Sequence, residues 1–330
     1  MAPFARRAAA LALTALVLYG VAPAVGDVLG AWPKVRDLHP WWLAAMVFFE
    51  VASLWCLWEL QALSIGTHDQ VAVATSQLAG GALGRVVPGG AATAAAAQYN
   101  MLNAADVPRG SIATGLAAAT VLQVAGLCVL PLLALPAVVI GLRVPGTLLE
   151  TGVLALGLFG AMFAVGMLLA RSEQVLRWIG RTARDLSCRL PRVAPLPADL
   201  PDRLVAHRDA VHERLGDRLL YAAGAALGRW MFDLLALVTA IIAVGAHPPF
   251  SLVLLCFVTA QLLAQIPVTP GGIGVVEAGL TATLALAGVG GGDAALATLA
   301  YRLVSYWLML PAGLVAWLVH RRRVAVAATP

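Results

Sequence analysis

Apolar stretches about 20 residues long recur along this chain of 330 residues. A helix needs about 20 apolar residues to cross the hydrocarbon core of a bilayer. We therefore predict an all-α, polytopic integral membrane protein with about six full transmembrane helices. The predicted spans are residues 8–29, 41–63, 111–135, 147–170, 219–244 and 294–319.

The composition argues against a water-soluble fold. Charged residues make up 12% of the chain and hydrophobic residues 61%, whereas soluble domains carry about 25% charged residues. Disorder, a disulfide-rich module and a nucleic-acid-binding domain are disfavoured too, because the basic residues lie beside predicted spans. The four cysteines (Cys56, Cys128, Cys188 and Cys256) are far apart, so we expect no disulfide framework, no metal site and no cofactor.

Two further apolar regions, 71–103 and 250–288, are each interrupted by a Pro-Gly-Gly sequence. Their arms run to roughly 13 to 17 residues, or about 20 to 25 Å of helix, which is short of a core about 30 Å thick. We predict re-entrant helical hairpins with Pro88-Gly89-Gly90 and Pro270-Gly271-Gly272 at the tips. Broken backbone at membrane depth must be buried in protein or line a wet cavity. Two short, tilted spans at each place are the alternative.

Basic residues predict the orientation of the chain, because cytoplasmic loops are rich in Arg and Lys. One side would hold Arg6, Arg7, Arg109, the loop 171–218 and Arg321 to Arg323; the other side would hold Lys34, Arg36 and Arg143. We expect a cell (plasma) membrane protein with both termini in the cytoplasm. A cleaved signal peptide over residues 1–25 is the alternative for the first span.

The chain divides into two similar halves. The offset that carries Pro88 onto Pro270 also carries span 41–63 onto 219–244, and span 111–135 onto the last span. Residues 1–170 would form the first membrane half with its hairpin. Residues 219–330 would complete the second half, which is led by span 147–170. Starting on opposite sides, the halves would be inverted repeats, as in transporters.

The loop 171–218 is the largest polar stretch. An apolar stripe at helical spacing predicts an amphipathic helix there, and a second helix is predicted from Asp199 with Pro201 in its first turn. The stripe consists of Val175, Leu176, Ile179, Ala183, Leu186 and Leu190. Both helices would lie on the cytoplasmic leaflet as an ordinary basic loop, or would recognise anionic lipid.

Charges inside predicted spans mark the candidate site, since each costs about 2.5 to 3.5 kcal/mol at the centre of a helix. Arg229 and Asp233 can pair, being four residues apart. Glu50 needs a partner, for which Arg85 and Arg302 are the candidates. Glu277 would interact with the free amides of a helix N-terminus, accept a proton or contact a cationic headgroup. Glu59 lies near a span end and can reach water.

Each hairpin tip would be followed by a helix N-terminus, which favours anions. Together with the buried arginines, this predicts a phosphate site between the tips. The candidate transport residues are Glu50, Arg85, Pro88, Gly89, Gly90, Arg229, Asp233, Pro270, Gly271, Gly272, Gly274, Glu277 and Arg302. No nucleophile has a nearby histidine and carboxylate, so we predict no enzymatic activity.

The second tip resembles a known family. Its sequence from Pro270 to Ala278, PGGIGVVEA, is similar to the P-G-G-x-G-x-x-E segment of the transmembrane, flippase-like domain of lysylphosphatidylglycerol synthases. The first tip, Arg85 to Gly90, resembles that family's other Pro-Gly turn. The resemblance covers nearly the whole chain and implies lipid translocation. We expect a stand-alone member without the aminoacyl transferase domain of full-length relatives. Residues 91–97 lack the charges that members of the family often carry there.

We therefore expect a flippase-like transporter that moves an anionic or aminoacylated phospholipid, or a polyprenyl-phosphate-linked lipid, between leaflets. The alternatives are a membrane enzyme, or an accessory scaffold, in lipid-linked glycan or phospholipid modification. Membrane lipids are the expected partners, with a lipid-modifying enzyme or glycosyltransferase as a further partner and no nucleic acid. The sequence leaves the oligomeric state open.

Overall fold

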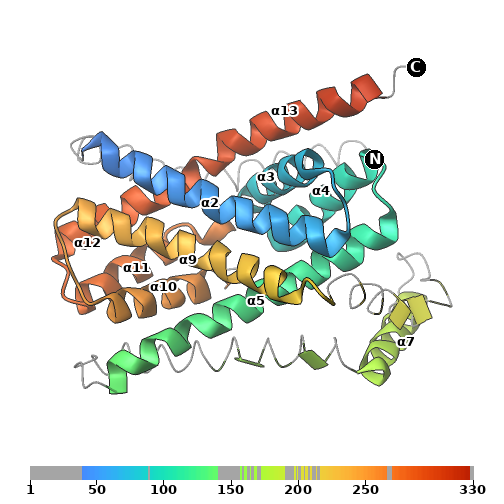
Figure 1. Cartoon of the computed structure of the whole chain (residues 1–330), viewed down its shortest axis with the longest axis horizontal. Coiled ribbons are helices and arrows are strands. Elements are labelled where there is room, and N and C mark those ends of the chain that lie inside the picture. The colour runs from blue at the N-terminus through green and yellow to red at the C-terminus, as the bar shows by residue number, and fades with distance from the viewer. Residues whose placement is uncertain are drawn as a thin grey trace.

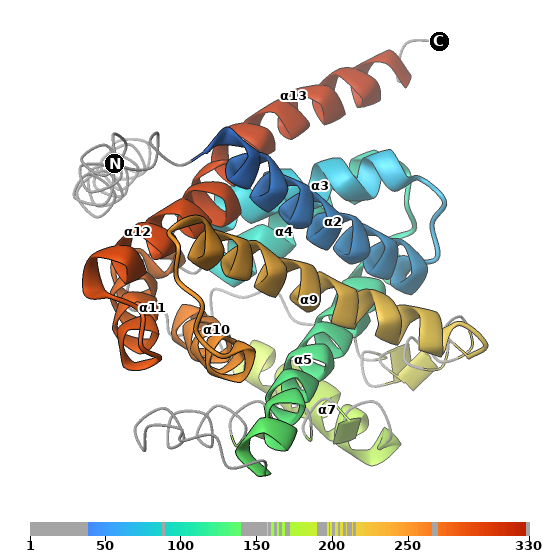
Figure 2. The ribbon, with the colours of Figure 1, turned by 60° about the vertical axis from the view of Figure 1, so that its left-hand side comes forward.

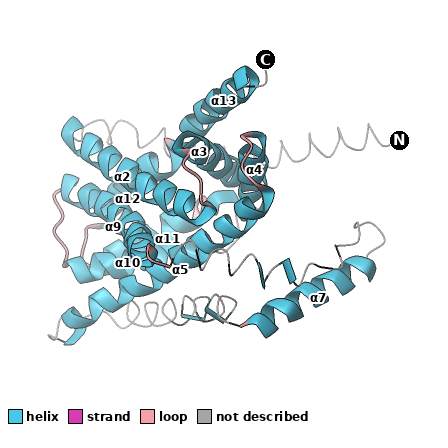
Figure 3. Cartoon of the chain, turned by 45° about the vertical axis from the view of Figure 1, so that its right-hand side comes forward, coloured by secondary structure: helices cyan, strands magenta, loops and turns pink. Residues whose placement is uncertain are grey.

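A computed structural model describes residues 39–87, 90–139, 172–189, 219–265 and 270–327, with scattered positions in 157–168 and 197–218. All regular structure in these residues is helical (Figure 3). The helices are α2 (Pro40–Ile65), α3 (Gln70–Val86), α4 (Gly90–Ala104), α5 (Arg109–Val139), α7 (Glu173–Arg189), α9 (Leu219–Ala243), α10 (Phe250–Gln265), η1 (Pro270–Gly272), α11 (Val275–Leu286), α12 (Gly291–Arg302), η2 (Leu303–Trp307) and α13 (Met309–Ala327).

Four helical stretches in the described residues are long and apolar enough to cross a bilayer. They are Pro40–Ile65, Arg109–Pro131, Leu219–Ala243 and Gly291–Val326, and they coincide with four of the six predicted spans. The predicted span 8–29 and the basic residues Arg6, Arg7, Lys34, Arg36 and Arg143 lie outside the described residues. Only isolated positions of span 147–170 are described.

The last span is longer than predicted and is not a single regular helix. It runs through α12, a π-helical turn η2 and α13, with the amide of Leu308 donating to the carbonyl of Leu303 at 2.9 Å. A wide turn of this kind leaves the hydropathy of the segment unchanged, so a prediction from hydropathy misses it. Such turns are frequent at functional sites, and this one directly follows Arg302.

Each interrupted region folds as two helical arms. Hairpin 1 consists of α3 and α4, with 17 and 15 residues, and hairpin 2 consists of α10 and α11, with 16 and 12 residues. A 12-residue helix is only about 18 Å long, less than the thickness of a hydrocarbon core. Re-entrance into a bilayer stays a prediction. Pro88, Gly89 and residues 266–269 lie outside the described residues.

Glycine is required where the arms of hairpin 1 cross and where hairpin 2 turns. A Cβ on Gly84 would lie 2.6 Å from the carbonyl oxygen of Gly90, so α3 and α4 approach closely only without it. At the second tip Gly271, Gly272 and Gly274 have φ angles of 63°, 70° and 83°. L-residues with side chains rarely adopt this left-handed backbone.

Corresponding helices of the two halves make corresponding contacts. Helix α2 packs along α9, hairpin 1 packs through α3 against α13, and hairpin 2 packs through α10 against α5 (Figures 1 and 2). Since α2, α3 and α5 correspond to α9, α10 and α12–α13 under the offset of the Pro-Gly-Gly tips, each contact has its counterpart.

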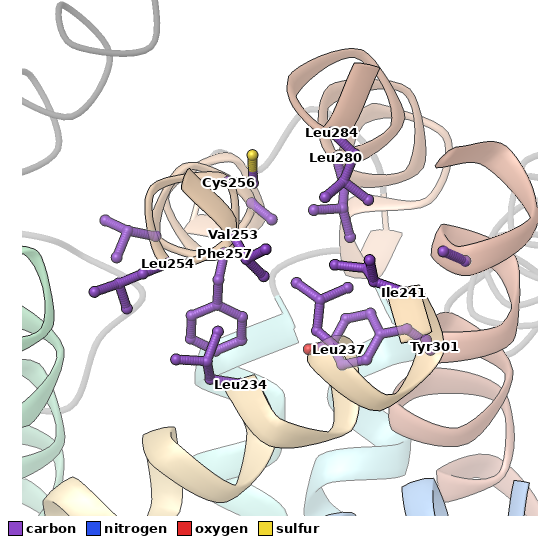
Figure 4. Close-up of a cluster of buried hydrophobic side chains, with 14 of the residues drawn as sticks. Leu234, Leu237, Ile241, Val253, Leu254, Cys256, Phe257, Leu280, Leu284 and Tyr301 are labelled. Atoms are coloured by element: carbon purple, nitrogen blue, oxygen red, sulfur yellow. The ribbon is translucent and has the colours of Figure 1, made fainter. Parts of the chain in front are cut away.

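The largest hydrophobic cluster joins α9 to hairpin 2 and α12. Leu234, Leu237 and Ile241 of α9 face Phe257 of α10 and Leu280 of α11, with Tyr301 among them (Figure 4). In a bilayer the lipid tails are as apolar as these side chains, so close packing rather than water exclusion holds such helices together. The cluster therefore fixes hairpin 2 against α9.

The predicted amphipathic helix in the basic loop is α7, which lies at the edge of the molecule (Figures 1 and 3). Trp178 is 63% exposed, and Glu173 pairs with Arg177 at 2.6 Å. In the second predicted helix, the described positions from Asp202 to Glu213 are helical, whereas its predicted start at Asp199 and positions 216–218 are turns.

Candidate functional site

Two groups of polar side chains lie among the long helices and the hairpins. The tip cluster lies where the two hairpin tips meet and consists of Arg85, Gly271, Glu277, Arg302 and Tyr306. The core cluster lies between α2 and α9 and consists of Glu50, Ser53, Arg229, Asp233, Gln261 and Tyr301. Together they contain all the charged residues that the sequence placed in the candidate site.

The tips meet because glycine permits it. A Cβ on Gly271 would lie 2.9 Å from the backbone oxygen of Arg85 and would also clash with the ring of Tyr306. The Tyr306 hydroxyl donates to that same Arg85 carbonyl at 3.0 Å. The end of α3 in hairpin 1, the turn of hairpin 2 and the π-helical turn η2 are therefore in direct contact.

Glu277 is held by two donors. Its Oε2 accepts a hydrogen bond from the backbone amide of Gly274 at 2.7 Å, and its Oε1 accepts one from Nε of Arg302 at 2.6 Å. The first contact caps the N-terminus of α11, where the helix dipole favours a carboxylate. Arg302 is 8% exposed and also lies 3.5 Å from the carbonyl oxygen of Gly271. This ion pair thus fixes α12 to the second tip.

Two guanidinium groups share one aromatic ring. The central guanidinium carbon of Arg302 lies 4.3 Å from the centroid of the Tyr306 ring, and that of Arg85 lies 5.7 Å from it. Cations within about 6 Å of a ring are attracted by its quadrupole. Arg85 donates to the carbonyl of Ser305 at 3.4 Å but forms no ion pair with a described carboxylate. Arg85 thus differs from Arg302 and Arg229, each of which is paired with a carboxylate.

The predicted pair of Arg229 and Asp233 is present, with 3.2 Å between Nη1 and Oδ2. Asp233 is 3% exposed and also accepts hydrogen bonds from Tyr301 at 2.7 Å and from Gln261 at 3.4 Å. Arg229 donates to the hydroxyl of Ser53 at 2.5 Å. Four helices, α2, α9, α10 and α12, therefore meet at one carboxylate and one guanidinium.

Glu50 does not have the partner that the sequence suggested. Neither Arg85 nor Arg302 forms an ion pair with it in the described part of the chain; Arg302 pairs with Glu277 instead, because α12 carries it to the second tip. Glu50 is 5% exposed, and its Oε2 has no hydrogen-bond partner among the described residues. The charges acting most strongly on it are those of Asp233, Arg229 and Arg85.

The remaining predicted site residues belong to the tips. Gly90 begins α4, and Pro270 begins η1, whereas Pro88 and Gly89 lie outside the described residues. Sequence reasoning missed Ser53, Gln261, Tyr301 and Tyr306. Their polar groups within apolar segments were the available signal, but such side chains are common in membrane helices and do not stand out as charges do.

No three His, Cys, Asp or Glu side chains gather as a metal site would require within the residues that the structure describes.

A protein-family match covers most of the chain. The model of the family described as lysylphosphatidylglycerol synthase TM region matches residues 7–313. The chain belongs to this family. It is a multi-pass membrane protein, and membership of the family points to a lipid-related function in the membrane.

A curated relative is a UPF0104 membrane protein of Methanothermobacter thermautotrophicus. It is 27% identical over 118 residues, which is 35% of this chain and 34% of the relative. The chain thus spans about a third of the length of the curated relative that it matches.

Proposed function

We propose that this protein moves a lipid with a phosphate-containing head between the leaflets of the membrane. The observation that carries the proposal is the pair of guanidinium groups beside Tyr306 at the meeting point of the hairpin tips. Arg302 is neutralised by Glu277, whereas Arg85 has no carboxylate partner in the described residues. The family supports a lipid as the substrate class.

Arginine suits this substrate because its planar, permanently charged fork binds phosphate oxygens with two parallel hydrogen bonds. The amide of Gly274 at the start of α11 is already occupied by Glu277. Arg85, rather than that helix terminus, is therefore the centre of the proposed headgroup site. Acyl or prenyl tails would stay in the lipid phase while the head crosses.

The proposed substrates are an anionic phospholipid, its aminoacylated form or a polyprenyl phosphate. We propose a cell-membrane location with both termini in the cytoplasm, inverted halves, and no catalytic activity of the chain itself. A lipid-modifying enzyme or glycosyltransferase would supply or consume the lipid.

The test is leaflet exchange in proteoliposomes. Purified protein is reconstituted with headgroup-labelled phosphatidylglycerol, its lysylated form or a polyprenyl phosphate, and a membrane-impermeant quencher follows the outer leaflet. A hydrogen bond to a charged group contributes about 1.5 to 3 kcal/mol, so Arg85→Ala should slow exchange of the transported lipid about 10- to 100-fold. The exposed Arg109, which donates to Asn103, gives the matched control Arg109→Ala, with exchange as in the wild type.

Unchanged exchange in Arg85→Ala would refute the headgroup site. If folded wild-type protein accelerated exchange of none of these lipids, the transport proposal itself would be wrong. Chemical conversion of a labelled lipid without movement between leaflets would instead identify an enzyme.

A further inference from the structure

The charges of the two clusters are not all paired. Arg229 pairs with Asp233 and Arg302 pairs with Glu277. Arg85 and Glu50 are left over, and they form no ion pair with each other or with another described residue, although each acts on the other through space. The charge of Glu50 is thus balanced from a distance by the same arginine that would receive an anionic headgroup.

Burial makes this arrangement sensitive to a ligand. Removing an ionised carboxylate from water costs several kcal/mol unless charges and hydrogen bonds compensate it. Glu50 is 5% exposed and its Oε2 has no described partner. The positive charges that act on it are those of Arg229, which is also paired with Asp233, and of Arg85.

The other groups near Glu50 do not supply the missing compensation. The carboxylate of Asp233 on α9 repels that of Glu50. The Tyr301 hydroxyl on α12 already donates its hydrogen bond to Asp233. On η2 the hydroxyl of Tyr306 already donates its hydrogen bond to the Arg85 carbonyl. An anion bound at Arg85 would therefore leave Glu50 with too little positive charge around it.

We propose that Glu50 is a proton-binding site whose occupancy is coupled to that of an anionic headgroup at Arg85. Binding of the headgroup cancels the charge of Arg85, and the Glu50 carboxylate then takes up one proton from water and becomes a neutral carboxyl group. Release of the headgroup reverses the step and returns the proton. This inference rests on the proposed function and adds its energy source, because a lipid that moves together with a proton can be driven by a proton gradient.

Coupling between two sites is reciprocal, so it can be measured from either side. The first measurement is titration calorimetry of short-chain phosphatidylglycerol into the full chain in detergent, in two buffers that differ in their enthalpy of ionisation. The wild type should take up close to one proton for each lipid bound at a pH where Glu50 is ionised in the free protein. Glu50→Gln should bind the lipid without proton uptake.

Glu59 provides a matched control because it lies on the same helix, accepts a hydrogen bond from Gln70 and is outside both clusters. Glu59→Gln should take up protons as the wild type does. Infrared difference spectroscopy of the wild type gives a second readout, since lipid binding should produce the absorption of a protonated carboxyl group and remove that of a carboxylate. This measurement decides the matter even if Glu50→Gln does not fold.

Lipid binding and leaflet exchange without proton uptake in the wild type would overturn this inference and leave the proposed function standing. Proton uptake that persists in Glu50→Gln would likewise overturn it. Failure of the wild type to bind or exchange any anionic lipid would instead refute the proposed function, and the inference with it.

Discussion

Asp69 and Arg323 show how a single ion pair fixes the entrance of hairpin 1. Nη1 of Arg323, near the end of α13, lies 2.7 Å from Oδ1 of Asp69, whose carboxylate also caps the N-terminus of α3 through the amide of Ala72. Partial burial alone would raise the pKa of Asp69, but Arg323 and the α3 amides outweigh burial and hold this pKa below its ordinary value.

A group with a lowered pKa in the folded state stabilises the fold above its unfolded pKa, which for Asp is about 3.9. That contribution is lost as the pH falls through the folded value. In detergent the wild type should therefore lose thermal stability between about pH 5 and pH 2 more steeply than Asp69→Asn does. Denaturation followed by circular dichroism at several pH values measures this.

Asp106→Asn is the matched control for that experiment. Asp106 is exposed in the neighbouring loop and has a positive φ of 61°, which asparagine tolerates. This variant should keep the pH dependence of the wild type. Identical pH profiles for Asp69→Asn and the wild type would show that the ion pair contributes nothing.

At the scale of the element, the tip of hairpin 2 depends on glycine for two separable reasons. Gly271 has both a left-handed backbone and a neighbouring Arg85 carbonyl that leaves no room for a Cβ, whereas Gly274 has the backbone angle but open space around it. Gly224, in the second turn of α9, has neither constraint. The three positions thus separate strain from crowding.

Alanine substitution should rank these positions. Gly271→Ala should destabilise the protein most, and Gly274→Ala should cost about 1 to 2 kcal/mol from backbone strain alone. Gly224→Ala should be neutral or stabilising by up to about 1 kcal/mol, because alanine is the better helix former. Unfolding midpoints in mixed detergent micelles give the order. Equal effects at Gly271 and Gly274 would mean that the two tips do not touch.

The helical elements were more predictable from the sequence than the site was. Hydropathy and the Pro-Gly-Gly interruptions are local properties, and they located α2, α9 and both hairpins within a few residues. The partner of a buried charge depends on how helices pack, which is not local. The pair of Arg229 and Asp233 was predictable because both lie on one helix. The pair of Arg302 and Glu277 was not, and neither was the unpaired state of Glu50.

At the scale of the molecule, helix contacts that match between the two halves surround charges that do not match. Under the offset that superimposes the Pro-Gly-Gly tips, Glu277 corresponds to Ala95, Arg302 to Thr120 and Asp233 to Val51. The packing of α3 on α13 nevertheless mirrors that of α10 on α5. The paired charges, Arg229 with Asp233 and Arg302 with Glu277, therefore belong to the second half, whereas the unpaired Arg85 and Glu50 belong to the first.

Inverted halves require the two hairpins to open toward opposite faces of the membrane. The base of hairpin 1 lies beside Asp106, and that of hairpin 2 beside Asp293; both residues are exposed. In a background with the four native cysteines replaced, Asp106→Cys and Asp293→Cys should react with a membrane-impermeant maleimide from opposite sides of the membrane.

Arg181→Cys on the exposed face of α7 provides the reference, because the basic loop predicts that this position is cytoplasmic. We expect Arg181→Cys and Asp106→Cys to react only after intact cells have been lysed. Asp293→Cys should react before lysis. Reaction of Asp106→Cys and Asp293→Cys from one side would mean that the halves are parallel. The two halves, with their matching packing of α3 on α13 and of α10 on α5, would then be related by a symmetry axis along the membrane normal. The hairpin tips could not approach the centre of the bilayer from opposite faces.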